Sequence, residues 1–456
     1  MLKQQKIFFD FLRFCIGSAK EIPGSLKEVD WKELYAIAKK QCLVGVLFDG
    51  IKKLPAEHVG MEKELLLQWM AESQMLKKAN VRLNDAAIHV SEWFRKKGFR
   101  TCILKGQGNA LMYPNPYSRT PGDIDIWVEG GDKRIISFVR SISPHEKACY
   151  HHIEFPSYKG VEVEVHYRPS FLLCFWNNRK LQKYYERVKE EQFSHRVMLG
   201  EQGEIAIPTV EFNIIFQLTH IYSHLMNEGI GLRQLLDYYY VLCDFYKVYQ
   251  NSSKITPSLF TIKEGSTSYP DPLTLRGEGG NRPTRCSEPL RSKDGRPSKV
   301  SPDCAGWDRR GVSGDTGSVS CSSGSSITSV SSAFTTDSSA STALDVIQRE
   351  LKYLGLWKFA GAVMFVLHEV LELAEDKMIV PMDEKRGRLL LAEILDGGNF
   401  GRHFTKYARF THQSMRKKYF LKIWRNMHFV RYYPAEALCE PLFRTWHFFW
   451  RMKNKK

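Results

Sequence analysis

Apolar residues recur at helical spacing through most of the first hundred residues. The runs WKELYAIAKKQCLVGVLFDGIKKL and MEKELLLQWMAESQMLKKANVRLNDAAIHVSEWFRKKGF place them at i, i+3 and i+4, the period of an amphipathic helix. The second run closes at Lys97 and Gly98, and a glycine in this place is expected to stop the helix. Residues 1–98 are therefore predicted to form an N-terminal helical region.

The hydrophobic period changes after residue 98. The run RTCILKG predicts a short buried strand, and DIDIWVE alternates polar and apolar residues at the period of two that is typical of a strand. Farther on, CYHHIEFPSYKGVEVEVHYRP predicts two strands joined at residues 157–160. With one or two helical turns in QGNALMY and a helix in GDKRIISFVRSIS, residues 99–170 predict a unit of strand, helix, strand, helix and hairpin.

Helical periodicity returns after residue 170. It is strong in TVEFNIIFQLTHIYSHLMNEG and in IGLRQLLDYYYVLCDFYKVYQ, and HRVMLGEQGEIAIP before them predicts a strand or hairpin. The C-terminal run from Tyr419 is aromatic and basic. Packing in the core, with Lys and Arg stems extended to solvent, is the first explanation. Single-stranded nucleic-acid binding and association with a membrane surface are the alternatives.

One long segment lacks any sustained period. Residues 251–343 are dominated by Gly, Ser, Thr and Pro, as in SGDTGSVSCSSGSSITSVSSAFTTDSSAST. Such a composition buries too little apolar surface to offset the entropy lost on ordering, so the segment is predicted to be disordered. It is either a linker without a further role or a tether and target of modification.

The composition of the chain indicates which classes of binding partner and which cellular compartment to expect. The net charge of +16 favours an anionic partner such as a nucleotide, a nucleic acid or a membrane surface, and a solvated basic surface is the alternative. The ten cysteines form no CxxC pair and no disulfide framework, which favours reduced thiols in a cytoplasm. No helical apolar run approaches the ~20 residues that span a bilayer. The N-terminus lacks the unbroken apolar core of a secretory signal, so a cytoplasmic protein is expected.

Two aspartates, Asp123 and Asp125, interrupt an apolar strand. Residues i and i+2 of a strand share a face, so the two carboxylates are expected side by side, where they repel unless a cation neutralises them. A hard ion such as Mg²⁺ does so through oxygen ligands. A third carboxylate joins them if the VEVEVH strand pairs alongside, because Glu162, Glu164 and His166 alternate with three core valines. This set is typical of two-metal phosphoryl or nucleotidyl transfer.

The strand before the aspartates ends in LKGQG, a candidate phosphate-binding turn. Gly106 lets the backbone approach an anion, the start of a following helix favours phosphate, and Lys105 adds a positive charge. The turn lacks the GxxxxGK[ST] pattern of a P-loop.

These motifs occur together in a known family. The stretch ILKGQGNALMYPNPYSRTPGDIDIWV, followed by HHIEF, VEVEVHYRPS and LRQLLDYYYVL, resembles an uncharacterised bacterial nucleotidyltransferase family of the DNA polymerase beta-like nucleotidyltransferase superfamily. An LKG turn, an R-x-x-GDID strand and an E-x-H strand typify this family. The similarity extends over most of the chain outside residues 251–343. Gly106-Gln107 departs from the superfamily, in which Gly or Ser usually follows the glycine, and the gap from the turn to the aspartates is long.

The resemblance implies an α+β fold in which a small mixed sheet is flanked by N- and C-terminal helical regions, with two Mg²⁺ ions and a nucleoside triphosphate at the carboxylates. The expected divisions are 1–98, 99–170, 171–250, 251–343 and 344–456. By this resemblance Glu164, two residues before His166, is the third ligand in preference to Glu162. The expected site comprises catalytic and metal-binding Asp123, Asp125 and Glu164, nucleotide-binding Lys105, Gly106, Gln107, Arg119 and Gly122, and candidate substrate contacts His166 and Arg233.

The other histidines are expected to lie mainly outside the active site. His151 and His152 fall on opposite faces of their predicted strand, so only one is expected to reach the site, and a surface position is the first expectation. His220 and His224 stand at i and i+4 of a helix but lack the glutamate of an H-E-x-x-H motif, so they are expected in the core or at an interface.

Two arginines have open roles. Arg119 is expected either to neutralise a phosphate or to pair with an aspartate. Arg233 and Asp237, at i and i+4, are expected to form a helical ion pair unless Arg233 reaches a phosphate.

The expected function is Mg²⁺-dependent transfer of a nucleoside monophosphate from a triphosphate to an unknown acceptor, which is a small molecule, a protein or a nucleic acid. The alternative is a catalytically inactive module of the same fold that senses nucleotide or binds a protein or nucleic acid. The altered turn at Gln107 motivates this alternative.

Overall fold

The computed structural model describes residues 3–201, 203–251, 338–404 and 415–454. Most of the segment predicted to be disordered therefore lies outside the described residues. The predicted end of that segment at residue 343 is wrong, because helix α10 already begins at Ser338. Ala343 packs into the hydrophobic core and so anchors the first turns of this helix, a tertiary contact that local composition does not predict.

The N-terminal region is helical, as predicted. It contains α1 (Lys3–Ile16), α2 (Trp31–Lys40), α3 (Val44–Ile51) and α4 (Lys63–Lys96), with single turns η1 (Gly24–Glu28) and η2 (Ala56–His58). The carboxylate of Asp30 caps α2 by accepting hydrogen bonds from the N–H groups of Lys32 and Glu33. α4 ends where expected, and Gly98 follows it with a φ of +80°, which glycine adopts without strain.

Residues 99–170 contain every predicted strand and helix. The strands β1 (Thr101–Leu104), β2 (Ile124–Val128), β3 (His152–Tyr158) and β4 (Val161–His166) form a sheet in the order β1-β2-β4-β3. β2 and β4 are parallel and the other neighbours are antiparallel, so the sheet is mixed as expected. The connections carry α5 (Gly106–Ala110), η3 (Pro116–Ser118) and α6 (Gly131–Ile142).

The described chain after the sheet is helical except for one hairpin, which was also predicted. Its elements are α7 (Phe175–Ser194), the hairpin β5 (Arg196–Met198) and β6 (Glu204–Ala206), α8 (Val210–Asn227), α9 (Leu232–Asn251), α10 (Ser338–Tyr353), α11 (Trp357–Leu371), η5 (Glu375–Lys377), α12 (Glu384–Gly397), η6 (Asn399–Gly401), α14 (Met415–Met427) and α15 (Pro434–Lys453). Of the helices described, none combines the length and the apolar character needed to cross a membrane.

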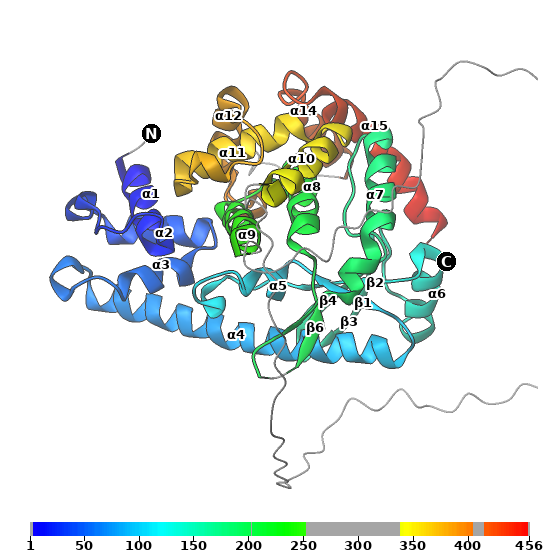
Figure 1. The fold of residues 1–456 in the computed structure, drawn as a ribbon, viewed down its shortest axis with the longest axis horizontal. Helices are drawn as coiled ribbons and strands as arrows, with labels where there is room; N and C mark the ends of the chain where they lie inside the picture. The colour runs from blue at the N-terminus through cyan, green and yellow to red at the C-terminus, as the bar shows by residue number, and fades with distance from the viewer. Residues whose placement is uncertain (1–2, 202, 252–337, 405–414, 455–456) are drawn as a thin grey trace, which may run out of the picture. The chain divides into compact units, whose positions relative to one another are not determined.

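The two faces of the mixed sheet have different neighbours. The isoleucines of β2 and the valines of β4 pack against α4 and α6 in one core, and Figure 1 shows α4 running along the sheet. The opposite face of β2 carries Asp125 and Trp127. Trp127 packs against Phe193 of α7 and Phe212 of α8, with ring centroids 4.6 and 5.8 Å apart. The alternation of β2 and β4 therefore directs their acidic side chains away from α4.

The aromatic C-terminal region joins the core along part of its surface. Phe429, Tyr433 and Phe443 are buried, whereas Leu442 and Phe449 are each 63% exposed. The explanation by core packing therefore holds for one side of α15 and not for the other.

A buried ion pair fixes the loop before β2 onto α9. Arg119 donates from Nε and Nη2 to the two carboxylate oxygens of Asp237, at 2.8 Å each, and the hydroxyl of Tyr113 donates to Oδ1 at 2.7 Å. The predicted ion pair between Arg233 and Asp237 is wrong, because the Asp237 carboxylate faces Arg119. Arg233 instead donates from Nη1 to the carbonyl oxygen of Thr120 at 3.1 Å.

We expect Asp237→Asn to destabilise the fold by about 3–5 kcal/mol, because it leaves the Arg119 guanidinium buried without its counter-charge. Tyr113→Phe removes a single hydrogen bond to the same carboxylate and should cost about 1 kcal/mol. Urea unfolding of the two variants measures the difference. Equal losses would show that the charge of the pair contributes nothing beyond a neutral hydrogen bond.

Candidate active site

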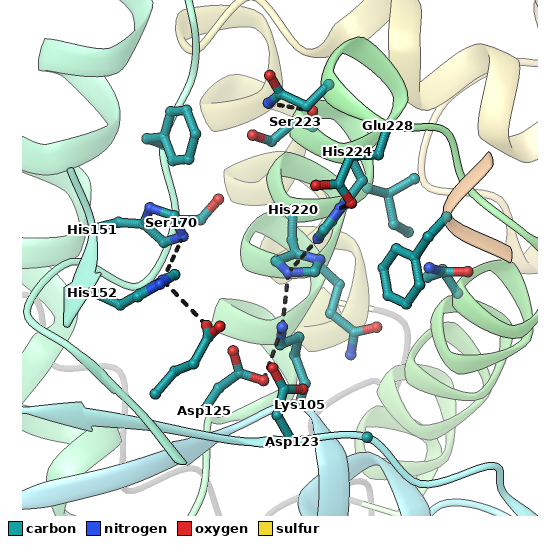
Figure 2. Close-up of a pocket in the computed structure, with 18 of the residues that line it drawn as sticks. Lys105, Asp123, Asp125, His151, His152, Ser170, His220, Ser223, His224 and Glu228 are labelled. Atoms are coloured by element: carbon teal, nitrogen blue, oxygen red, sulfur yellow. Dashed lines mark hydrogen bonds and ion pairs between the residues drawn. The ribbon is translucent and has the colours of Figure 1, made fainter. Parts of the chain in front are cut away.

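A cavity of about 610 Å³ lies on the acidic face of the sheet. Its walls come from the β1–α5 turn, β2, β3, β4, α8, α9 and α15, and Figure 2 shows the polar side chains that converge in it. Of the ten predicted site residues, nine line this cavity; they are Lys105, Gly106, Arg119, Gly122, Asp123, Asp125, Glu164, His166 and Arg233.

The three predicted metal ligands meet at the centre of the sheet. Asp125 stands directly opposite Glu164 in the parallel pairing of β2 and β4, and Asp123 lies two residues before Asp125. One carboxylate oxygen from each of the three lies within 4.8 Å of the others. Glu162, the competing third ligand, is exposed and outside this cluster. The parallel register therefore brings together the residues that the two strand patterns predicted separately.

The charges of the cluster are unevenly compensated. Burial raises the pKa of Asp125, but Lys105 and His166 outweigh it and hold that pKa well below the ordinary value. The Lys105 ammonium is 2.9 Å from Oδ2, and His166 Nε2 is 2.9 Å from Oδ1. Repulsion by Asp125, together with burial, raises the pKa of Asp123 to about 6. No described side-chain cation is within ion-pair distance of Asp123. Positive charge is thus missing on the Asp123 side.

The glycine turn is held in an unusual backbone conformation. Lys105 and Gly106 have φ values of +52° and +49°, and only the glycine adopts such a value without cost. The turn directs Lys105 into the cavity, where its ammonium also contacts His220 Nε2 at 2.8 Å. The side chain of Gln107 points the other way and donates to Asn84 Oδ1 of α4. Gln107 is therefore the predicted site residue whose side chain does not line the cavity.

Both members of the His151-His152 pair reach the cavity, so the expectation that only one does so is wrong. β3 begins at His152, and the alternation of a strand does not extend back to His151. His151 Nε2 lies 3.1 Å from His152 Nδ1, which is in turn 3.1 Å from Glu164 Oε2. Burial lowers the pKa of His152 to about 4 and that of His151 well below the ordinary value, so both rings are neutral at pH 7.

His220 and His224 also line the cavity, which corrects their expected place in the core or an interface. Their Nε2 atoms are 3.1 Å apart, and burial lowers the pKa of His220 well below the ordinary value. The signal in the sequence was their i, i+4 spacing, which puts both on one face of an otherwise apolar α8. His166 behaves differently: burial lowers its pKa, but Asp125 and Glu164 raise it to about 9.

Positive side chains surround the wider part of the cavity. Arg233 lies beside Gly122, and its Nε is buried without a hydrogen bond among the described residues. Arg402 stands near η6, and Arg444 and Arg451 come from α15. The two α15 arginines were not predicted as site residues, because basic residues at this spacing are also typical of a solvent-exposed helix face.

Residues 27–248 match the model of a protein family described as an uncharacterised nucleotidyltransferase. The match runs from just before α2 almost to the end of α9 and includes the whole mixed sheet and the three clustered carboxylates. Over these residues the chain is similar to that nucleotidyltransferase family, as its motifs predicted. No curated protein and no solved structure matches the chain.

Replacing Asp123 should change how the stability of the metal-free protein depends on pH. Because the pKa of Asp123 in the fold, about 6, is above that of an unfolded aspartate, protonation favours the fold. This contribution is fully present below about pH 4 and is lost as the pH rises through about 6. Between pH 4 and 7 the wild type should therefore lose about 2 kcal/mol relative to Asp123→Asn. Urea unfolding in the presence of a chelator tests this, and parallel pH profiles of the two proteins would contradict it.

Proposed function

We propose that the protein is a Mg²⁺-dependent nucleotidyltransferase that moves a nucleoside monophosphate from a triphosphate to an acceptor hydroxyl or phosphate. The observation that supports this most strongly is the cluster of Asp123, Asp125 and Glu164 on two parallel strands of a nucleotidyltransferase-family domain. A cytoplasmic location is part of the proposal, supported by the free thiols of the described cysteines.

The residues of the cluster fit Mg²⁺. They present carboxylate oxygens, the donors that this ion prefers. Asp123 has no ion-pair partner among the described residues, although it lies beside two other carboxylates. When bound, Mg²⁺ supplies charge neutralisation and Lewis-acid activation at the phosphates. Asp123 and Asp125 would hold both ions and Glu164 would complete one of the two sites.

The surrounding residues would bind and orient the triphosphate. Lys105 serves as the counter-ion of Asp125 in the free protein, and its long side chain can turn to a phosphate oxygen once the carboxylates bind another cation. The backbone around Gly106 and Gln107 and the Gly122 entry to β2 leave room for close approach. Arg233, with its buried and unpaired Nε, faces the same region.

The proposed transfer forms a bond between the acceptor oxygen and the α-phosphorus and breaks the bond from that phosphorus to pyrophosphate. For a hydroxyl acceptor, Glu164 takes the proton that the oxygen loses. Its carboxylate is ionised and can accept a proton: burial raises its pKa, and contacts with His166 and His152 outweigh that effect and lower it.

A catalytically inactive nucleotide-binding module of the same fold is the second candidate. Lys105 and His166 already place a cation beside each oxygen of Asp125, so the cluster is partly neutralised without a metal ion. Gln107 also departs from the small residue that the superfamily resemblance leads one to expect after the glycine.

Pyrophosphate release from each ribonucleoside triphosphate with Mg²⁺ separates the two candidates. Asp125→Asn and Glu164→Gln should each reduce release by about a thousandfold, since each removes a proposed ligand of the ions that would neutralise the phosphates. The matched control is Glu162→Gln, two residues away on the same strand but exposed, which should retain wild-type turnover. Triphosphate binding without release across a broad acceptor panel would favour the module. Wild-type turnover in Asp125→Asn would overturn the assignment.

Arg233→Gln should weaken Mg²⁺-triphosphate binding by about tenfold or more, because a charge-assisted hydrogen bond to phosphate is worth roughly 1.5–3 kcal/mol. Isothermal titration calorimetry measures the dissociation constants. Arg134→Gln is the control, because Arg134 is an exposed arginine on α6 outside the cavity. Equal affinities for the two variants would remove Arg233 from the phosphate site.

A further inference from the structure

We propose that His152, Glu164 and His166 form a separate metal site, on the β3 side of Glu164, for a first-row transition dication such as Zn²⁺. The inference goes beyond the proposed function, because it concerns another ligand set and another class of ion. The oxygen cluster of Asp123, Asp125 and Glu164 would share only Glu164 with it.

The strand register builds this site. His152 stands directly opposite His166 in the antiparallel pairing of β3 and β4, and Glu164 lies two residues before His166 on the same face. Glu164 Oε2 is 3.1 Å from His152 Nδ1 and 3.4 Å from His166 Nε2. Ligand atoms about 2.0–2.2 Å from one ion stand roughly 3–3.5 Å apart. The three atoms, all within 4.8 Å of one another, therefore have a spacing that one ion can bridge.

His166 provides an independent observation that points to a ligand. Its side chain is 2% exposed, and its Nδ1 contacts the carbonyl oxygen of Arg168 at 3.3 Å. Its buried Nε2 is directed at Asp125 Oδ1 and Glu164 Oε2, at 2.9 and 3.4 Å. When Nδ1–H donates to a backbone carbonyl, Nε2 of the neutral ring carries the lone pair that binds a metal ion, which is the usual arrangement around a metal-binding histidine. An ion bound at Nε2 would replace the contact with Asp125.

The donor set determines the class of ion. Two imidazoles and one carboxylate suit Zn²⁺ and related transition ions, whereas Mg²⁺ prefers an all-oxygen shell with several waters. His151 Nε2 lies 3.1 Å from the same His152 Nδ1 that faces Glu164, so an ion bound at Nδ1 would replace this contact. Figure 2 shows His151 and His152 on the wall of the cavity across from His220 and His224, so the proposed ion would be accessible from the cavity.

The competing explanation needs no ion. In it, His166 is a protonated internal counter-ion for Asp125 and Glu164, and His152 donates a hydrogen bond to Glu164. Both explanations account for the contacts, and they differ in whether the intact protein binds a stoichiometric transition ion through these two rings.

Zn²⁺ titration of chelator-treated full-length protein, in competition with a chromogenic chelator, decides between them. We expect the wild type to bind Zn²⁺ with at least about tenfold higher affinity than His152→Gln and His166→Gln. His224→Gln, which removes another histidine of the same cavity, should bind as the wild type does. The visible absorption of bound Co²⁺ should report imidazole ligation in the wild type and change in the first two variants. His152 is the less buried ring, so His152→Gln keeps the test decisive if His166→Gln does not fold.

Two outcomes would overturn the inference: no stoichiometric Zn²⁺ binding, or the same Zn²⁺ affinity in all four proteins. The experiment is independent of nucleotidyl transfer. Asp123→Asn should lose Mg²⁺-triphosphate binding and keep Zn²⁺, and His152→Gln should show the reverse. If Zn²⁺ binding fails while pyrophosphate release persists, only the transition-metal site is lost; if release fails while Zn²⁺ binds, only the proposed function is lost.

Discussion

The structure depends on the parallel pairing of β2 with β4, which places Asp125 opposite Glu164 inside a buried sheet. Carboxylates at this separation, away from bulk water, repel one another and are costly to bury without compensation. A third carboxylate, Asp123, adds to the repulsion, as its raised pKa shows. The surrounding elements can be understood as the means by which the fold tolerates this concentration of negative charge.

The compensation comes from several distant parts of the chain. Lys105 reaches Asp125 from the β1–α5 turn, although its positive φ costs on the order of 1–3 kcal/mol. His166 contacts the same carboxylate from the end of β4. Asp237 lies nearby on α9 but is fully engaged by Arg119, so it adds no free negative charge to the cavity. Asp125 thus has a cationic partner at each carboxylate oxygen, whereas Asp123 has no ion-pair partner among the described residues.

Much of this arrangement was predictable from local pattern. The period-two runs around Asp125 and Glu164 predicted both strands. Because residues i and i+2 of a strand share a face, the same runs predicted which polar side chains would lie together. The motifs also predicted the family match. The strand pattern alone did not distinguish Glu164 from Glu162, since both lie on the same face of the strand, and the choice of Glu164 came from the family resemblance. The place of His151 in the cavity was not predicted, because the strand begins one residue later than its pattern suggested. Asp237 was paired with Arg233, because i, i+4 spacing does not reveal a closer tertiary partner.

The cavity is completed by sequence outside the family match. The carboxylates, the glycine turn, Arg119 and Arg233 all lie within residues 27–248, so the region that would bind metal and triphosphate belongs to the family domain. Arg444, His447 and Arg451 come from α15, nearly two hundred positions farther along the chain, and line the other part of the same cavity. The matched residues form only one part of the cavity wall, so the family match alone does not identify the molecule that the other part would bind. α15 therefore contributes positive charge to a part of the cavity wall that lies outside the matched residues.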